Sequence, residues 1–202
     1  MVRAHAAAER RLELTIAHAD LREMAANMYA GRPEAQAAAF ARHVDRLKAG
    51  GCGAVAVTSM GGHFCIRQLE AISSLPLIDA IPALDRHFAA SGLRRVGVLD
   101  SRNAMASRLY GVGSVEVMAP ADEDLPTVHA TYVAMAAAAE ATDAQCRYLA
   151  EQGQKLHEAG AEAIVLGGTD LFLAFDGRPP PYPLIDSALV HAAAIARVAM
   201  GA

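Results

Sequence analysis

Two glycine-containing loops, each preceded by a short apolar run, carry the side chains best suited to chemistry. The first is TSMGGH at residues 58–63, and the second is GGTD at residues 167–170. Hydroxyls and glycine N–H groups at such turns bind a carboxylate, while a histidine or an aspartate can accept a proton. The candidate catalytic residues are therefore Ser59, His63 and Asp170. The candidate substrate-binding residues are Thr58, Gly61, Gly62, Gly168 and Thr169, together with Arg102 as a clamp for a carboxylate.

Several of these residues also have a purely structural interpretation. His63 opens a predicted helix, where a histidine more often packs or caps than acts as a base. Asp170 can cap the helix after its strand, and the loop glycines can serve only tight turns. Cys65 follows His63 by two residues, a spacing that disfavours a catalytic pair on one helix face. Asp79 and Asp186 each follow the tripeptide PLI and precede alanine-rich segments, which is typical of helix N-caps.

The two loops belong to an internal repeat. Residues 47–62 and 156–171 both read as a helix end with Ala-Gly, a short strand and a loop of small residues. The offset is 109 residues between the loops and 107 between PLIDA at 76–80 and PLIDS at 183–187. A repeat of this length predicts two similar α/β halves related by a pseudo-twofold axis. Because ligand sites in such sheets lie at the carboxyl ends of strands, we expect both loops to face one inter-lobe cleft.

The predicted elements around the loops alternate between strands and helices. This alternation predicts an α/β fold with two pseudo-symmetric lobes, each a mainly parallel sheet flanked by helices. The first lobe takes residues 1–80 and 187–202, and the second takes residues 81–186. Predicted strands cover residues 54–57, 75–79, 94–100, 114–118, 163–167 and 183–186, and predicted helices cover residues 33–49, 80–91, 127–139, 141–159 and 187–200.

Composition narrows the class of protein. The chain has 202 residues, 53% of them hydrophobic, which is enough for a sizeable core in one domain or two closely packed halves. A net charge of −4 and the absence of tryptophan argue against a nucleic-acid partner. Three cysteines without metal-type spacing favour a reducing compartment and no metal site. No segment has the apolar length of a membrane span or the pattern of a signal peptide, so we expect a cytoplasmic protein.

Over residues 11–200 the chain resembles the aspartate/glutamate/hydantoin racemase superfamily. The family's first loop is similar to C-N-T-x-H and its second to G-C-T-E, with P-x-I-D later in the chain. Residues 96–111 (VGVLDSRNAMASRLYG) also resemble the family's middle strand and its threonine-rich loop. The resemblance implies a cofactor-independent isomerase, an amino-acid racemase that acts on a small amino or dicarboxylic acid and forms a homodimer. One thiol removes the α-proton from one face, and a second thiol returns a proton to the other.

The chain departs from this pattern at both thiol positions, which hold Ser59 and Gly168, whereas Thr169 matches the family. The family's first strand is missing, and residues 12–24 match its second strand. A serine hydroxyl is too weak to deprotonate a carbon acid unaided, so the two-thiol reaction cannot run here as in the family. Three interpretations stay open: an enzyme with altered bases, a catalytically inactive carboxylate-binding or regulatory paralogue, and a truncated remnant.

Overall fold

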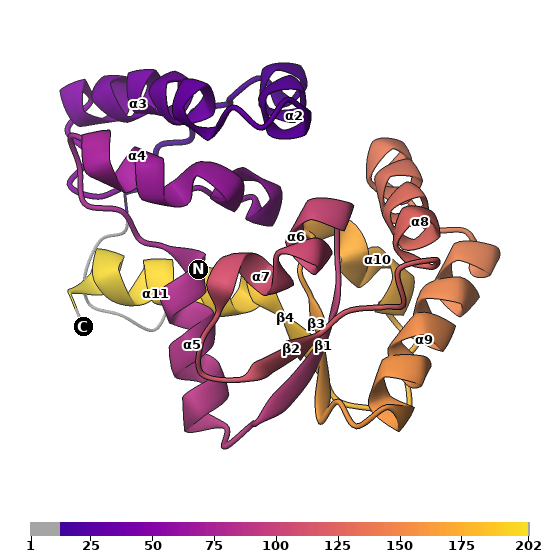
Figure 1. Cartoon of the computed structure of the whole chain (residues 1–202). Coiled ribbons are helices and arrows are strands. Elements are labelled where there is room, and N and C mark those ends of the chain that lie inside the picture. The colour runs from indigo at the N-terminus through magenta and orange to yellow at the C-terminus, as the bar shows by residue number, and fades with distance from the viewer. Residues whose placement is uncertain (1–12, 202) are drawn as a thin grey trace. The chain divides into compact units, whose positions relative to one another are not determined.

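The computed structural model describes residues 13–201 (Figure 1). Contacts within the chain divide it into two compact units. The first unit holds the residues up to Thr58, Gly62–Asp79 and the residues from Ala192 onward. The second unit holds Ser59–Gly61 and Ala80–His191.

The second unit is built on a four-stranded parallel sheet in the order β2-β1-β3-β4. Its strands are β1 (Arg95–Leu99), β2 (Glu116–Met118), β3 (Ala163–Leu166) and β4 (Leu184–Asp186). All of β3, and all of β1 after its first residue, are buried, as expected for apolar strands covered on both faces. The predicted α/β fold with a parallel sheet is therefore confirmed.

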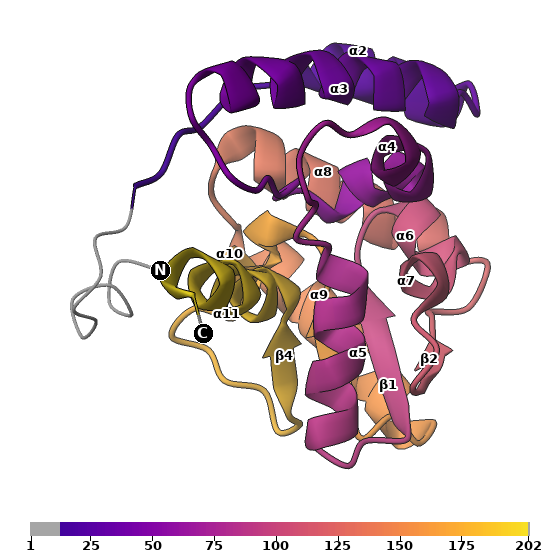
Figure 2. The ribbon, with the colours of Figure 1, turned by 90° about the vertical axis from the view of Figure 1, so that its left-hand side faces the viewer.

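Two long helices cover this sheet. Helix α5 (Ala80–Ala90) lies on one face and α9 (Asp143–Glu158) on the other (Figures 1 and 2). A capping box begins α9, because the Thr142 side chain accepts a hydrogen bond from the backbone three residues later, and that residue's side chain bonds back. Gly97 lets α9 approach closely, since a Cβ atom there would lie 3.0 Å from Cβ of Leu156.

The remaining helices of the second unit are short, apart from α8. Helix α6 follows β1 after a two-residue loop, and a 3₁₀ turn, η2, and then helix α10 follow β3 after a loop of the same length. Helix α8 contacts both η2 and α6, so these elements gather beyond the carboxyl ends of two neighbouring strands (Figure 2). Their bounds are α6 (Arg102–Ala106), α7 (Arg108–Gly111), α8 (Leu125–Ala138), η2 (Thr169–Leu171) and α10 (Phe172–Phe175).

The first unit is mainly helical in its described part. Helix α3 packs on α2 and α4 around a small core that includes Phe40, Val44 and Leu69. Pro33 begins α3 at a position where its missing N–H is not needed. The bounds are α2 (Leu21–Tyr29), α3 (Pro33–Ala49), a 3₁₀ helix η1 (Met60–Cys65), α4 (Ile66–Ile72) and α11 (Ser187–Met200), of which η1 and α11 each extend into the second unit.

The two strands predicted at residues 54–57 and 75–79 pair only through one isolated parallel bridge, between Val55 and Leu77. A proline at position 76 has no N–H to donate, which shortens the ladder on that side. The predicted mainly parallel sheet is therefore present in the second unit, whereas the described part of the first unit holds this single bridge.

The match of residues 12–24 to a strand is wrong for the residues that the structure describes. Residues 13–20 have no regular structure, and α2 begins at Leu21. Asp20 caps this helix, because its Oδ1 accepts a hydrogen bond of 2.7 Å from the N–H of Arg22. The capping carboxylate favours a helix in the segment that the family resemblance had matched to a strand. Residue 12 lies outside the described residues.

The two copies of the sequence repeat share one local pairing. Val55 is the bridge partner of Leu77, and Ile164 is the partner of Leu184, with the 109- and 107-residue offsets relating the two pairs. In each copy the N–H of the first residue donates to the carbonyl of the proline before its partner, at 3.0 Å and 2.8 Å. The repeat is therefore a repeat of backbone pairing as well as of sequence.

Among residues 13–201, no helix combines the length and the apolar character that a bilayer crossing requires.

Candidate functional site

The carboxyl edge of the four-stranded sheet brings together three chain segments. Asp100 follows β1, Gly167 follows β3 and Ser187 follows β4. The Ser187 hydroxyl donates a 2.9 Å hydrogen bond to the Gly167 carbonyl. The Gly167 N–H donates to the carbonyl of Leu99, also at 2.9 Å. The second glycine loop is thus held from both neighbouring strands.

Asp100 is a buried acid at this edge, with 1% of its surface exposed. One carboxylate oxygen accepts from the N–H of Ser101, and the other has no partner among the described residues. Burial raises the pKa of Asp100 to about 7, although hydrogen bonds from Ser101 act in the opposite direction. A carboxyl group that titrates near neutral pH therefore lies directly behind the loop.

Tyr132 of α8 covers Gly168, the second residue of this loop. A Cβ atom built on Gly168 would lie 2.5 Å from the Tyr132 hydroxyl oxygen, so the tyrosine fills the space of a side chain there. Burial raises the pKa of Tyr132, and the charges of Asp100 and Asp170 raise it further, against a hydrogen bond with Thr169 that lowers it. The hydroxyl is consequently neutral at physiological pH.

Thr169 and Asp170 lie at the solvent side of the same loop. Thr169 is exposed, Asp170 is half-buried, and the Thr169 hydroxyl donates a 3.2 Å hydrogen bond to a carboxylate oxygen of Asp170. Neither η2 nor α10 has a side-chain cap. The interpretation of Asp170 as a helix cap is therefore wrong, because its carboxylate accepts from a neighbouring hydroxyl instead of a backbone N–H.

Arg102 lies at the start of α6 with its side chain exposed. Its backbone N–H donates to Nδ1 of His129 on α8, at 3.3 Å. Burial and the nearby charge of Arg102 lower the pKa of His129, so the imidazole is neutral at neutral pH. The hydrogen bond links α6 to α8 beside the loop and leaves the guanidinium group in solvent.

In the first loop, Thr58, Gly62 and His63 belong to the first unit. Thr58 is exposed, whereas His63 is 2% exposed and its Nε2 lies 3.5 Å from Oδ1 of Asp79. A Cβ on Gly62 would lie 2.9 Å from a methyl group of Val57, so close packing requires this glycine. These contacts favour the packing interpretation of His63 and Gly62.

Ser59 and Gly61 belong to the second unit, and both are half-buried. Met60, between them, is buried in the main hydrophobic core of that unit and anchors the loop there. Cys65, farther along η1, is fully buried, and burial raises the pKa of its thiol to about 11. A thiol with that pKa is protonated at neutral pH, so Cys65 is not a base in the folded chain.

The N-cap interpretation of Asp186 is confirmed. Its Oδ1 accepts from the N–H of Ala188 at 2.8 Å and from that of Leu189 at 3.3 Å, at the start of α11. Asp186 therefore has a structural role, as the N-cap of α11. Its counterpart in the repeat, Asp79, faces His63 as described above.

Three residues at the edge were not expected from the sequence: Asp100, His129 and Tyr132. Asp100 had a signal, since it directly follows a strand and stands among the polar residues of DSRN. His129 and Tyr132 had none, because they lie on a helix with an apolar, alanine-rich sequence. Only the packing of α8 on η2 and α6 brings them to the loop.

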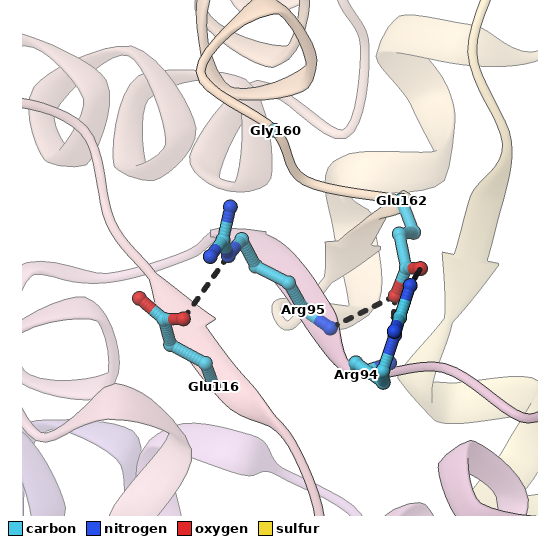
Figure 3. A pocket seen from close by; sticks show the side chains of 5 residues that line it. All are labelled: Arg94, Arg95, Glu116, Gly160 and Glu162. Carbon is cyan, nitrogen blue, oxygen red and sulfur yellow. Dashed lines mark hydrogen bonds and ion pairs between the residues drawn. The ribbon is translucent and has the colours of Figure 1, made fainter.

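A depression with a volume of about 380 Å³ lies at the opposite, amino edge of the sheet. Its charged groups pair with one another: Arg95 Nε lies 3.0 Å from a Glu116 oxygen, and Glu162 accepts from the N–H groups of Arg94 and Arg95 at 2.6 and 2.9 Å (Figure 3). Hydrogen bonds from these two N–H groups lower the pKa of Glu162. Since the arginines already have carboxylate partners, this depression is a weaker candidate for an anion than the carboxyl edge.

No group of three or more His, Cys, Asp or Glu side chains within residues 13–201 is arranged to hold a metal ion.

A sequence model of the Asp/Glu/hydantoin racemase family matches residues 1–195. The chain belongs to this family. The match covers both glycine loops and both PLID segments.

Solved structures of the racemase family share the fold. A structure described as a putative Asp/Glu racemase from Yersinia pestis is 22% identical with a TM-score of 0.84, over 98% of this chain and 89% of that one. An aspartate racemase homologue from Pyrococcus horikoshii is 22% identical with a TM-score of 0.74, over 93% and 83%. The aspartate racemase of Picrophilus torridus is 17% identical with a TM-score of 0.64, over 80% and 68%. At these identities the likeness is one of fold.

Proposed function

We propose that this racemase-family protein binds a small amino or dicarboxylic acid at the carboxyl edge of its parallel sheet. There it would move a proton at the carbon atom next to the ligand's carboxylate, without a cofactor. The observation that carries the proposal is the Asp100 carboxyl, buried behind residues 167–170 with a pKa of about 7. Perturbed acids of this kind concentrate at sites of proton transfer, where a pKa near the working pH is most effective.

The roles of the other residues follow from their chemistry. Asp170, half-buried at the solvent side of the loop, is proposed as the proton acceptor. The Thr169 hydroxyl and the Arg102 guanidinium are proposed to bind the carboxylate and to stabilise the enediolate that forms when the α-proton leaves. Protonated Asp100 carries no charge, so its raised pKa favours an anionic ligand in front of it.

From the first loop, Ser59 and His63 are proposed as further catalytic residues. Thr58 and Gly61 are proposed as ligand-binding residues, together with Gly62 and Gly168.

Solvent deuterium incorporation tests the proposal. The protein is incubated in heavy water with L- and D-aspartate and with L- and D-glutamate, and mass spectrometry measures deuterium at the α-carbon. We expect incorporation above a control without protein, and its loss in Asp170→Asn. Asp176→Asn is the matched control, because Asp176 is an exposed carboxylate six residues farther along the chain. Equal incorporation by both variants would exclude Asp170 as the proton acceptor.

The alternative is a carboxylate-binding or regulatory paralogue without turnover. It is favoured by Ser59 and Gly168, since neither position offers a thiol. Such a protein would incorporate no deuterium, yet one of the four acids would raise its melting temperature. A protein with neither response would contradict both functions.

We also propose a homodimer. The described part of the first unit exposes several large apolar side chains, which a second copy would cover. Light scattering after gel filtration would give twice the chain mass if the proposal is right and the mass of one chain if it is wrong. These side chains are Leu14, Ile16, Leu21 and Val198.

A further inference from the structure

The space beside Gly168 is occupied by a side chain from another element. A Cβ atom on Gly168 would lie 2.5 Å from the hydroxyl oxygen and 2.7 Å from Cε2 of Tyr132. A thiol carried by residue 168 would have its sulfur about one bond length beyond that Cβ atom. The tyrosine hydroxyl therefore lies in the region that a cysteine sulfur at this position would take.

Tyr132 is held in this place by its helix. Val128 and Met135 of α8 are fully buried in the core of the second unit, one turn before and about one turn after Tyr132. The helix contacts η2, which begins at Thr169, and the Thr169 hydroxyl is a hydrogen-bonding partner of Tyr132. The ring is half-buried, so part of it stays in reach of solvent.

We propose that Tyr132 has taken over the position of the family's second thiol as a ligand-binding group, whose hydroxyl donates a hydrogen bond to the carboxylate of the bound acid. The inference rests on the proposed function, since it names a contact of the same ligand at the same edge of the sheet. It assigns Tyr132 a contact with the ligand that neither the family's loop pattern nor the sequence of α8 indicates.

The surroundings suit a donor better than a base. Burial, reinforced by the neighbouring carboxyl groups of Asp100 and Asp170, raises the pKa of the hydroxyl and keeps it protonated, because a phenolate would be a charge in a desolvated place. A neutral tyrosine hydroxyl carries one proton that it can donate to a ligand. A hydrogen bond to a charged acceptor is among the stronger ones in proteins, and it stays strong where water is partly excluded.

The same geometry restricts the ligand. With Tyr132 over Gly168, the ligand's carboxylate must meet the ring edge and the hydroxyl instead of a small thiol. The class that fits is a short amino or dicarboxylic acid, because its carboxylate can approach the hydroxyl without a bulky group beside it.

The first arm of the test measures binding. Tyr132→Phe keeps the ring over Gly168 and removes only the donor, and Tyr29→Phe is the matched control on an exposed tyrosine of α2. Calorimetric titration with L-aspartate, D-aspartate and succinate gives the Kd values. We expect Tyr132→Phe to weaken binding about tenfold or more, and Tyr29→Phe to leave the Kd unchanged.

The second arm measures the contact without a ligand. We expect Gly168→Ala to lower the melting temperature in the wild-type chain, because the new methyl group meets Tyr132, and to have a much smaller effect in Tyr132→Ala. Gly113→Ala is the control, since a Cβ on Gly113 meets nothing within 4 Å.

The two arms distinguish failure of the donor role of Tyr132 from failure of the proposed function. Tyr132→Phe with the wild-type Kd would overturn the donor role while leaving the proposed function in place. Additive effects of Gly168→Ala and Tyr132→Ala would overturn it as well, since Tyr132 would not then occupy the space of residue 168. If none of the three acids binds the wild-type chain, the proposed function fails and the donor role fails with it. In that case, non-additive effects of Gly168→Ala and Tyr132→Ala would show that Tyr132 is only a packing residue.

Discussion

The Asp100 carboxyl group packs against Gly167, the first residue of the second glycine loop. A Cβ atom on Gly167 would lie 2.8 Å from Cγ of Asp100. An acid at the end of β1 and a glycine at the end of β3 are thus placed together by the register of two neighbouring parallel strands, in which Leu99 pairs with Leu166.

This contact predicts that Gly167→Ala destabilises the fold by about 1–3 kcal/mol, because the added methyl group forces a buried side chain to move. Urea denaturation measures the loss. Asp100→Gly, which removes the opposing carboxyl, should relieve most of the effect of Gly167→Ala. A Gly167→Ala variant as stable as the wild type would show that the carboxyl does not lie against the loop.

Asp100 also predicts a pH dependence of stability. Between its ordinary pKa of 3.8 and its folded-state pKa of about 7, the folded chain binds more protons at this group than the unfolded chain. Stability from Asp100 is therefore fully present below pH 3.8 and is lost as pH rises through about 7. The loss is up to about 1.4 kcal/mol per pH unit within this window.

Urea denaturation of the wild type and of Asp100→Asn at several pH values measures this term. The difference in free energy of unfolding between them, wild type minus variant, should fall across the window and level off above it. A difference that does not change with pH would mean that Asp100 keeps an ordinary pKa in the folded chain.

The cysteines should differ in reactivity. Cys65 is fully buried, its thiol donates to the Gly62 carbonyl at 3.4 Å, and its pKa is raised to about 11. Cys52 is only half-buried. In the native protein at pH 8, an aromatic disulfide reagent should therefore modify Cys52 at least about tenfold faster than Cys65. Peptide mass spectrometry identifies the labelled residue, and labelling of Cys65 at the rate of Cys52 would contradict the burial.

The double substitution Ser59→Cys with Gly168→Cys should not by itself create a working two-thiol site. The second substitution places its side chain in the space of Tyr132, so we expect the double variant to be destabilised and without added racemase activity. Addition of Tyr132→Ala should make room for the thiol and allow racemisation of aspartate or glutamate, followed by circular dichroism at constant substrate. Equal activity of the double and triple variants would show that Tyr132 does not block the position.

In the first unit, the buried side chains of Asn27 and Gln36 join α2 to α3 through a 2.9 Å hydrogen bond. Gln36→Ala should lower the free energy of unfolding by about 1–3 kcal/mol, because the Asn27 amide would be left buried without this partner. Thermal denaturation measures the change. Asn27→Ala with Gln36→Ala should be less damaging than the sum of the two single substitutions.

Local sequence patterns were sufficient to predict most helices and strands of the second unit. Glycines and apolar periodicity mark the ends of α9 and β3 within one or two residues of the structure, because both signals act within a few residues of the chain. The strand predicted at residues 54–57 forms only one bridge in the structure, because a strand also needs a hydrogen-bonded partner and Pro76 has no N–H to donate. Helix α8 begins two residues before the predicted start, with Pro126 in its first turn.

The candidate site was predictable only where it lies on one continuous loop. The sequence alone indicates a site at residues 167–170, because two glycines, a hydroxyl and an acid follow an apolar run. Tyr132 reaches that loop from α8, more than 30 residues away in sequence. The pKa of Asp100 is near 7 because the side chain is buried. Both are consequences of tertiary packing, which no local pattern encodes.

All of the proposed roles depend on binding of the ligand at the carboxyl edge of the sheet. Backbone amide NMR of the labelled wild-type chain, titrated with aspartate, tests it most directly, since each edge has its own set of amides. We expect shift changes centred on residues 100–102, 129–132 and 167–170, with none at Arg95, Glu116 and Glu162 of the amino-edge depression. Changes confined to the amino edge, or no changes at either edge, would contradict it.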